Sequence, residues 1–248
     1  MQIRTVNVTR YVTPLREGGS LPAIVEADDD GLYVLKFRGA GQGVKALVAE
    51  LVAGEIGRAL GLKVPEIVFV ELDPVLAMTE PDPEIQDLIK ASAGLNLALD
   101  YLPGSMMYDT AVQEPSSKLA SEIVWFDAYT ANVDRTPRNA NMLIWHKELW
   151  LIDHGAALYF HHNWDTFASN NRNPFAMIKH HMLLPFAKDI DKADAELSAK
   201  LTDEVLIGIV SLIPDEWLVQ PAEMRDAYLD FLLTRLKEPR DFAREAAG

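Results

Sequence analysis

The first seventy residues carry the hydrophobic patterns of β-strands. Apolar and β-branched residues concentrate at 6–12, 23–25, 32–37 and 67–70, and such runs are typical of strands. The acidic segment 28–30 with Gly31 separates the second and third runs and predicts a hairpin turn. From 45 to 62 apolar residues recur at roughly helical spacing, and Gly61 predicts the end of that helix.

Beyond this region the chain changes from strand to helix patterns. Residues 95–102 predict one more strand, which ends at Pro103-Gly104. Residues 117–131 predict a buried helix, and 142–145 and 149–152 predict two short strands joined by a polar turn. Residues 154–185 show no regular pattern and are rich in Asn and His. Residues 186–248 show mainly the hydrophobic periodicity of helices. The order predicts an α+β, two-lobed fold: a β-rich N-lobe with one helix at 1–98, a hinge at 99–104 and a mostly helical C-lobe at 105–248.

Composition is that of an ordinary globular protein, with 49% hydrophobic and 24% charged residues. The absence of Cys excludes disulfides, thiolate zinc sites and cysteine nucleophiles, and fits a reducing compartment. The N-terminal residues show no signal-peptide pattern. The longest apolar run, 205–213, is about half the length that a bilayer span needs. A cytoplasmic protein without a membrane span is therefore expected.

The charge balance limits the partners. Lys and Arg total 23 against 37 for Asp and Glu, which gives a net charge of −14. Such a surface repels phosphate backbones, so we expect no nucleic-acid partner. If the chain binds a nucleotide, it must do so with a few local cations and a metal ion.

The strongest chemical signal is the polar loop N-V-D-R-T-P-R-N-A-N at 132–141, which a predicted hairpin and Asp153-His154-Gly155 follow. Phosphoryl transfer requires a site that holds magnesium against phosphates and orients the attacking hydroxyl. Asp134 would accept or orient the substrate proton. Asn139 and Asp153 would hold magnesium through oxygen, which this ion prefers.

Polar clusters of this kind also occur as plain turns, because Asp, Asn and Pro dominate loops for conformational reasons. The apolar strand 149–152 leads directly to Asp153, which is followed by Gly155 two positions later, and this favours a functional site over a turn alone.

Lys36 is the second signal. Strict alternation in 33–37 puts Lys36 on one face of the strand and the large apolar residues on the other. A lone strand lysine is most often solvated, but a helix with acidic residues follows, as in the Lys-Glu pair that steadies ATP phosphates in kinases. Glu50 is the better partner, although spacing alone leaves Glu55 open.

Three other patterns give weaker signals. Gly18-Gly19-Ser20 would let backbone N–H groups approach phosphate, although most such stretches are turns and no P-loop sequence occurs. The pairs His161-His162 and His180-His181 could ligate zinc, but without Cys or H-E-x-x-H they fit a substrate-facing loop or its packing better. No G-x-S-x-G elbow supports serine hydrolase chemistry.

Together these residues resemble the HipA-like branch of the protein-kinase-like superfamily, which is related to phosphatidylinositol kinases. The resemblance covers the strand with Lys36, the helix with Glu50, the 132–141 loop and Asp153-His154-Gly155, over roughly the first two thirds of the chain. It implies ATP and Mg²⁺ as cofactors, and a protein Ser or Thr or a small molecule as phosphoacceptor.

The resemblance also implies a role for each matching position. Lys36 would contact the α and β phosphates and Glu50 would pair with it. Asp134 resembles the catalytic base, and Asn139 and Asp153 resemble the magnesium ligands. The backbone of the hinge would meet adenine at Leu99, Asp100, Tyr101 and Leu102.

The chain departs from the family pattern in two places. The loop reads D-R-T-P-R-N, where HipA toxins usually have His two positions after the Asp, and D-H-G replaces the D-F-G of ordinary protein kinases. Neither change removes a metal ligand. From the short length we also expect the N-terminal subdomain of full HipA toxins to be absent, and this expectation argues against a toxin and antitoxin partnership.

Two other functions stay open at the level of sequence. One is a pseudokinase that binds nucleotide without transferring phosphoryl, although such a protein has no chemical need for Asp134. The other is a nucleotide-dependent transferase or phosphohydrolase that uses the same carboxylates.

Overall fold

The computed structural model describes residues 2–15, 21–41, 43–163 and 171–248. Its strands are β1 (Thr5–Pro14), β2 (Ala23–Ala27), β3 (Leu32–Lys36), β4 (Ile67–Leu72), β5 (Gly94–Asp100), β6 (Met106–Met107), β7 (Met142–Trp145) and β8 (Glu148–Leu151). Its α-helices are α1 (Val44–Leu60), α2 (Pro83–Ala91), α3 (Ser117–Thr130), α5 (Ile190–Ser198), α6 (Asp203–Val210), α7 (Pro221–Leu236) and α8 (Asp241–Ala247). The described residues also form the 3₁₀ helices η1 (Pro74–Thr79), η2 (Tyr159–His162), η4 (Ala176–His180), η5 (Leu184–Phe186) and η6 (Asp215–Trp217).

Five strands close into a barrel in the order β1-β2-β3-β5-β4. All neighbours are antiparallel except β1 and β4, which pair in parallel from Thr5 opposite Phe69 to Asn7 opposite Glu71. Along β1 the partner then changes to β2. Because β1 pairs with both β2 and β4, the five described strands of the barrel leave no edge strand open in it.

Alternating side chains fill the barrel interior, as the pattern of β3 illustrates. Tyr33 and Leu35 are buried inside, whereas Val34 and Lys36 are only half-buried on the other face. Helix α2 and η1 cover one end of the barrel, where Ile85 and Ile89 join its core. The sequence pattern did not predict α2, although Asp82 caps it through the amide of Glu84 and Pro83 begins it.

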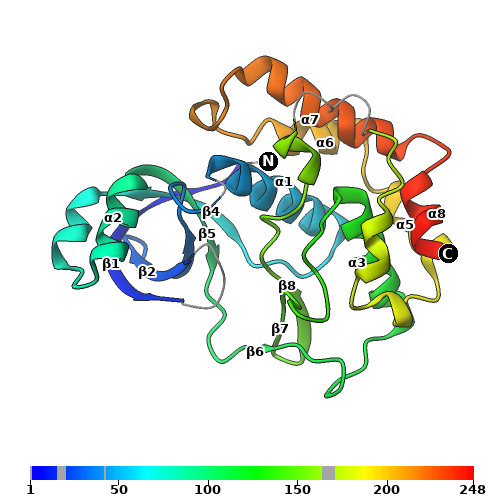
Figure 1. Ribbon diagram of the computed structural model, residues 1–248, viewed down its shortest axis with the longest axis horizontal. Helices are drawn as coiled ribbons and strands as arrows, with labels where there is room; N and C mark the ends of the chain where they lie inside the picture. The colour runs from blue at the N-terminus through cyan, green and yellow to red at the C-terminus, as the bar shows by residue number, and fades with distance from the viewer. Residues whose placement is uncertain (1, 16–20, 42, 164–170) are drawn as a thin grey trace.

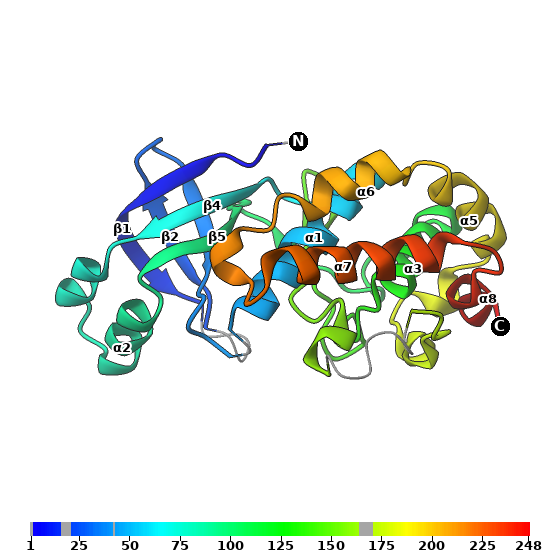
Figure 2. The same ribbon diagram turned by 90° about the horizontal axis from the view of Figure 1, so that it is seen from above.

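Helix α1 lies between the barrel and the helical part of the chain (Figures 1 and 2). It is buried on nearly all sides, and its residues belong to the core that also contains α3. At Gly54 a Cβ atom would come 2.5 Å from Ile67 Cδ1, so a larger residue here would require the Ile67 side chain of β4 to shift. Gly61 ends the helix in the left-handed conformation, as predicted.

The helical part contains α3 at its centre, with α5, α7 and α8 packed against it (Figure 1). The small sheet β6-β7-β8 lies beside it. The β7–β8 hairpin turns at His146 and Lys147, which both have positive φ, and this is the geometry of a tight two-residue turn. Trp217 in η6 joins the helical part to the barrel through its indole N–H, which donates to the carbonyl of Leu95.

Most predicted elements are confirmed within one or two residues, and the segment 154–185 is irregular where it is described, with short 3₁₀ helices. Among the described residues, no helix has the combined length and apolar character that crossing a membrane requires.

Candidate active site

Three predicted residues meet at the junction of β3, α1 and the segment after β8. Lys36 Nζ lies 2.7 Å from Asp153 Oδ1 and 3.5 Å from Glu50 Oε2. The side chains of Lys36 and Glu50 are 11% and 2% exposed, whereas Asp153 is 42% exposed and faces solvent. The ammonium group of Lys36 therefore lies between one buried carboxylate and one accessible carboxylate.

The charges of this group are mutually stabilised. Burial alone lowers the pKa of Lys36, but the charges of Glu50 and Asp153 outweigh burial and hold that pKa above its ordinary value. Burial alone raises the pKa of Glu50, but the Lys36 charge and the bonds from His154 hold it below its ordinary value. Both side chains are therefore ionised at neutral pH.

The structure separates the two acidic candidates on α1. Glu55 pairs with Arg58 one turn along the helix, at 3.1 Å, while Glu50 reaches Lys36. Glu50 is held from a second direction, because the backbone N–H of His154 donates to Glu50 Oε1 at 3.0 Å and His154 Nδ1 lies 3.2 Å from the same oxygen.

The sequence identified His154 only as a departure from a family pattern. Its ring is fully buried and packs edge-to-face against Phe126. Since an ionised Glu50 can only accept, Nδ1 carries the proton of this bond. His154 thus joins Asp153, its neighbour in the chain, to helix α1.

The polar loop at 132–141 is a tight turn that holds Asp134. Thr136 and Asn139 exchange two backbone hydrogen bonds of 3.0 Å, so Pro137 and Arg138 form the tip. Asn139 Nδ2 donates to Asp134 Oδ2 at 2.7 Å, and Asn141 Nδ2 lies 3.3 Å from the same oxygen. The two amides orient the carboxylate, and the structure thereby brings Asp134 and Asn139 together as predicted.

The loop is tied to the strand that leads to Asp153, because the N–H of Ile152 donates to the carbonyl of Asn141 at 3.0 Å. Asp153 itself has a φ of 56°, a left-handed conformation that is unusual for a residue other than glycine. Such backbone outliers are concentrated at functional sites.

The donor set fits a hard divalent cation. Asn139 uses its amide nitrogen for Asp134, and its Oδ1 accepts no hydrogen bond from the described residues, so this oxygen can ligate. Asp153 contributes an accessible carboxylate, 42% exposed. Within the described ranges, no group of three His, Cys, Asp or Glu side chains could hold a metal ion. A cation here would need further oxygen ligands from substrate and water, as magnesium sites commonly do.

A buried polar cluster under the loop was not predicted from the sequence. Asp127 of α3 accepts from Arg135 Nε at 2.6 Å, lies 2.8 Å from His181 Nε2 and accepts from Asn132 Nδ2 at 2.9 Å. Burial alone raises the pKa of Asp127, but the Arg135 charge and the His181 bond hold it well below its ordinary value. The only local signal was one acid in an otherwise apolar stretch of the predicted helix.

The predicted hinge follows β5. Leu99 and Asp100 are the last residues of this strand, which pairs with both β3 and β4. The N–H of Asp100 donates to Glu66 and that of Tyr101 to Leu32, while Leu102 is buried. The hydrogen bonds from the hinge amides to the barrel thus extend to Tyr101, and the next backbone amide along the chain is that of Leu102. Gly18, Gly19 and Ser20 lie outside the described residues.

The paired histidines have separate environments. His161 is buried, with Nδ1 3.1 Å from the Tyr228 hydroxyl, and burial, with smaller effects of His162 and Lys45, lowers its pKa to about 3. His181 belongs to the Asp127 cluster, and His180 is exposed. His161 and His181 are therefore packing residues, in accord with the preferred sequence interpretation.

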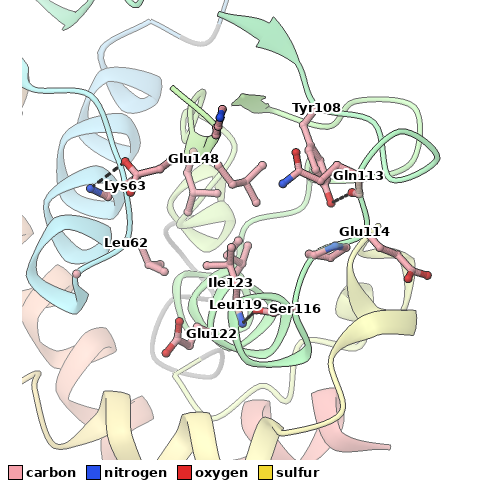
Figure 3. Close-up of a pocket in the computed structure, with 15 residues that line it drawn as sticks. Leu62, Lys63, Tyr108, Gln113, Glu114, Ser116, Leu119, Glu122, Ile123 and Glu148 are labelled. Atoms are coloured by element: carbon pink, nitrogen blue, oxygen red, sulfur yellow. Dashed lines mark hydrogen bonds and ion pairs between the residues drawn. The ribbon is translucent and has the colours of Figure 1, made fainter. Parts of the chain in front are cut away.

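A further cavity, of about 430 Å³, lies between the end of α1, the start of α3 and the β7–β8 hairpin. Figure 3 shows apolar side chains such as Leu62 and Ile123 facing it, with the ion pair of Lys63 and Glu148 at one side. None of the predicted site residues lines it.

Comparison with known proteins identifies the fold and family. The model of the family described as HipA-like kinase matches residues 8–242. The chain belongs to the HipA-like kinase family. This membership confirms the resemblance seen in the sequence and makes the chain a kinase. Among curated proteins, no sequence matches this chain.

Solved structures agree with the family assignment. The Helicobacter pylori proinflammatory kinase CtkA is similar, with a TM-score of 0.61 and 14% identity over 98% of both chains. The Golgi casein kinase with Mn/ADP bound is also similar, with a TM-score of 0.57 and 11% identity over 98% of this chain and 73% of that chain. A second structure of the Golgi casein kinase gives 0.54 at 10% identity over the same shares. At these identities the likeness shows a kinase-like fold.

Proposed function

We propose that this HipA-like kinase binds ATP with Mg²⁺ and transfers the γ-phosphoryl group to a hydroxyl, that of a Ser or Thr in a protein. The barrel and the helical part would be the two lobes of the kinase, with residues 99–104 as the hinge between them. The observation that carries the proposal is the contact of Lys36 with both Glu50 and Asp153, since it joins a phosphate-binding cation to a metal-binding carboxylate. The binding of Mn and ADP by the Golgi casein kinase supports the same ligand class.

Each residue has a separate task in this proposal. Lys36 would bind phosphate oxygens of ATP, and Glu50 keeps its ammonium group in place. Asn139 and Asp153 would hold Mg²⁺, which would neutralise charge on the phosphates when bound. The backbone at Tyr101 and Leu102 would meet adenine.

Asp134 is suited to orient the acceptor. Its Oδ2 is occupied by the amides of Asn139 and Asn141. The acceptor oxygen forms a bond to the γ-phosphorus while the bond from that phosphorus to the ADP oxygen breaks. The proton of the hydroxyl passes to the Asp134 carboxylate.

The proposal is tested by incubating the protein with γ-labelled ATP and Mg²⁺, alone and with cell lysate, and by identifying the nucleotide product. We expect label in a protein band and release of ADP. Asp134→Asn should lower transfer by about 10²- to 10⁴-fold, the usual contribution of a positioned proton acceptor, with little change in ATP affinity.

Three results would count against it. Release of AMP and pyrophosphate indicates another nucleotide-dependent transferase. Saturable ATP binding without turnover indicates a pseudokinase. Equal rates of transfer by Asp134→Asn and the wild type would show that Asp134 has no role in phosphoryl transfer.

The His154 bond to Glu50 gives a second prediction, concerning the residue that departs from D-F-G. His154→Phe keeps an aromatic ring against Phe126 and loses the donor, whereas His154→Asn keeps a donor at the position of Nδ1 and loses the ring. A hydrogen bond to a charged group contributes about 1.5–3 kcal/mol. We therefore expect His154→Phe to raise KM for ATP roughly tenfold or more, which corresponds to the lower end of that range, and His154→Asn to change it less.

The thermal midpoint separates this role from packing. His154→Phe should unfold at a temperature close to that of the wild type, because it also removes the buried Nε2, which has no partner among the described residues. If His154→Phe has wild-type kinetics and His154→Asn does not, then the ring positions Glu50 and the hydrogen bond does not.

A further inference from the structure

Basic side chains line a cavity beside the predicted catalytic loop. Its volume is about 780 Å³, and its walls are the tip of the 136–139 turn and the segment from η4 to Pro185. Arg138, Lys179 and His180, here called the basic cluster, face it, and among the described residues no Asp or Glu does. Met177 and Leu184 add apolar surface.

The cavity adjoins the residues proposed for phosphoryl transfer. Arg138 is at the tip of the turn that Thr136 and Asn139 close, and the N–H of Thr136 also donates to the carbonyl of Asp134 at 3.1 Å. One wall of the cavity is therefore part of the loop that holds Asp134.

The opposite wall is fixed to the same loop. The N–H of Met182 donates to the carbonyl of Arg135 at 3.1 Å. His181, in the same segment, lies 2.8 Å from the Asp127 carboxylate, which also binds Arg135. Both walls thus have a defined position relative to Asp134.

The side chains of the basic cluster are accessible to a ligand. Arg138 and His180 are exposed, and neither makes a hydrogen bond or an ion pair with the described residues. Lys179 is 63% exposed and pairs with Glu245 at 2.6 Å. In contrast, the buried Arg235 gives all three of its donor groups to backbone carbonyls.

These basic side chains occur in a chain with a net charge of −14. At physiological salt, charges interact over roughly 8 Å, so a ligand in the cavity responds to the basic cluster more than to the distant acidic surface. An anionic ligand is the complementary one, and the apolar rim suits a peptide better than a free ion.

We propose that the basic cluster is the acceptor subsite of this kinase and binds acidic residues that flank the phosphorylated Ser or Thr in a protein substrate. The inference rests on the proposed function, because it places the acceptor hydroxyl at Asp134. A small anionic metabolite would satisfy the charge but leave the apolar rim without a contact.

The test compares three Ser-containing peptides that differ only in their flanking residues: Asp and Glu, Ala, or Lys. With Mg²⁺ and ATP, the wild type should use the acidic peptide with a kcat/KM about tenfold above the Ala peptide, the size of two or three favourable surface charge pairs. Raising the salt concentration should reduce that preference.

Arg138→Glu should abolish or reverse the preference, because kcat/KM for the acidic peptide should fall about tenfold relative to that for the Ala peptide. Lys90→Glu is the matched control, since it makes the same change in net charge at a 55% exposed side chain on α2 (Figure 2), which caps the barrel. It should behave as the wild type does.

Equal use of the three peptides by the wild type, or an intact preference in Arg138→Glu, overturns the proposal. Phosphorylation of a small anionic hydroxyl compound but of no peptide also overturns it, together with the protein acceptor, and leaves ATP- and Mg²⁺-dependent phosphoryl transfer to a hydroxyl standing. Failure to bind or turn over ATP contradicts the proposed function itself.

Discussion

Lys36→Met is expected to lower phosphoryl transfer at least about 100-fold, the scale of losing one preorganised charge at a reacting group, and to destabilise the fold as well. The variant leaves Glu50, 2% exposed, without its cation. Breaking a buried ion pair by removing one partner costs roughly 3–5 kcal/mol. Chemical denaturation and the transfer assay measure the two effects on the same preparation.

The double variant Lys36→Met/Glu50→Gln distinguishes stability from chemistry. The substituted side chain on α1 would be neutral, and its amide oxygen would still accept from the backbone N–H of His154, so much of the lost free energy of unfolding should return. Transfer should not return, because no cation would meet the phosphates.

The control for this pair is Lys63→Met. Lys63 contacts Glu148 at 3.2 Å, but both side chains are about half exposed, at 50% and 52%. Its loss should cost under about 1 kcal/mol and leave transfer unchanged. Wild-type transfer by Lys36→Met, or recovery of transfer in the double variant, would show that Lys36 does not bind the phosphates.

Local sequence patterns predicted the parts of the site that lie within a single strand or a single loop. Alternation in β3 placed Lys36 on the face opposite Tyr33 and Leu35, and the structure has it there. The spacing of polar residues in the 132–141 loop assigned Asp134 and Asn139 to one site, and in the structure the two side chains share a hydrogen bond.

Contacts between distant segments could not be predicted in this way. Glu50 and Glu55 are five positions apart on α1 and point in different directions, so only the packing of the helix against β3 selects Glu50. Asp127 and His181 are 54 positions apart, and no local period relates them. The closure of the barrel likewise depends on the parallel pairing of β1 with β4, which adjacent hairpins do not specify.

The same limit explains why the role of His154 was not predicted. In the sequence it replaces an apolar residue of a familiar triplet, and a buried His is usually a satisfied packing residue. Its bond to Glu50 spans 104 positions and appears only when α1 lies against the segment after β8.

Removing the carboxylate of Asp127 is expected to destabilise the fold strongly. Arg135 and Asp127 are both 0% exposed at the side chain and 2.6 Å apart, and His181 and Asn132 share the carboxylate. Asp127→Ala would leave Arg135 buried without a counterion, at a cost of roughly 3–5 kcal/mol. Since Arg135 directly follows Asp134, we also expect slower transfer from the surviving folded protein. Asp215→Ala, at an ion pair of the same length whose carboxylate is 77% exposed, should cost under about 1 kcal/mol.

The pH dependence of unfolding identifies the carboxylate as the cause. Because the folded protein lowers the pKa of Asp127, the ionised form contributes stability that is complete above the unfolded pKa of about 4 and is lost as the pH falls toward the lower folded value. The difference in free energy of unfolding between wild type and Asp127→Asn should therefore be constant from pH 7 to about 5 and shrink below about 4. A difference that stays constant down to pH 3 would mean that the charge of Asp127 contributes nothing, and that its hydrogen bonds alone hold Arg135 and the catalytic loop in place.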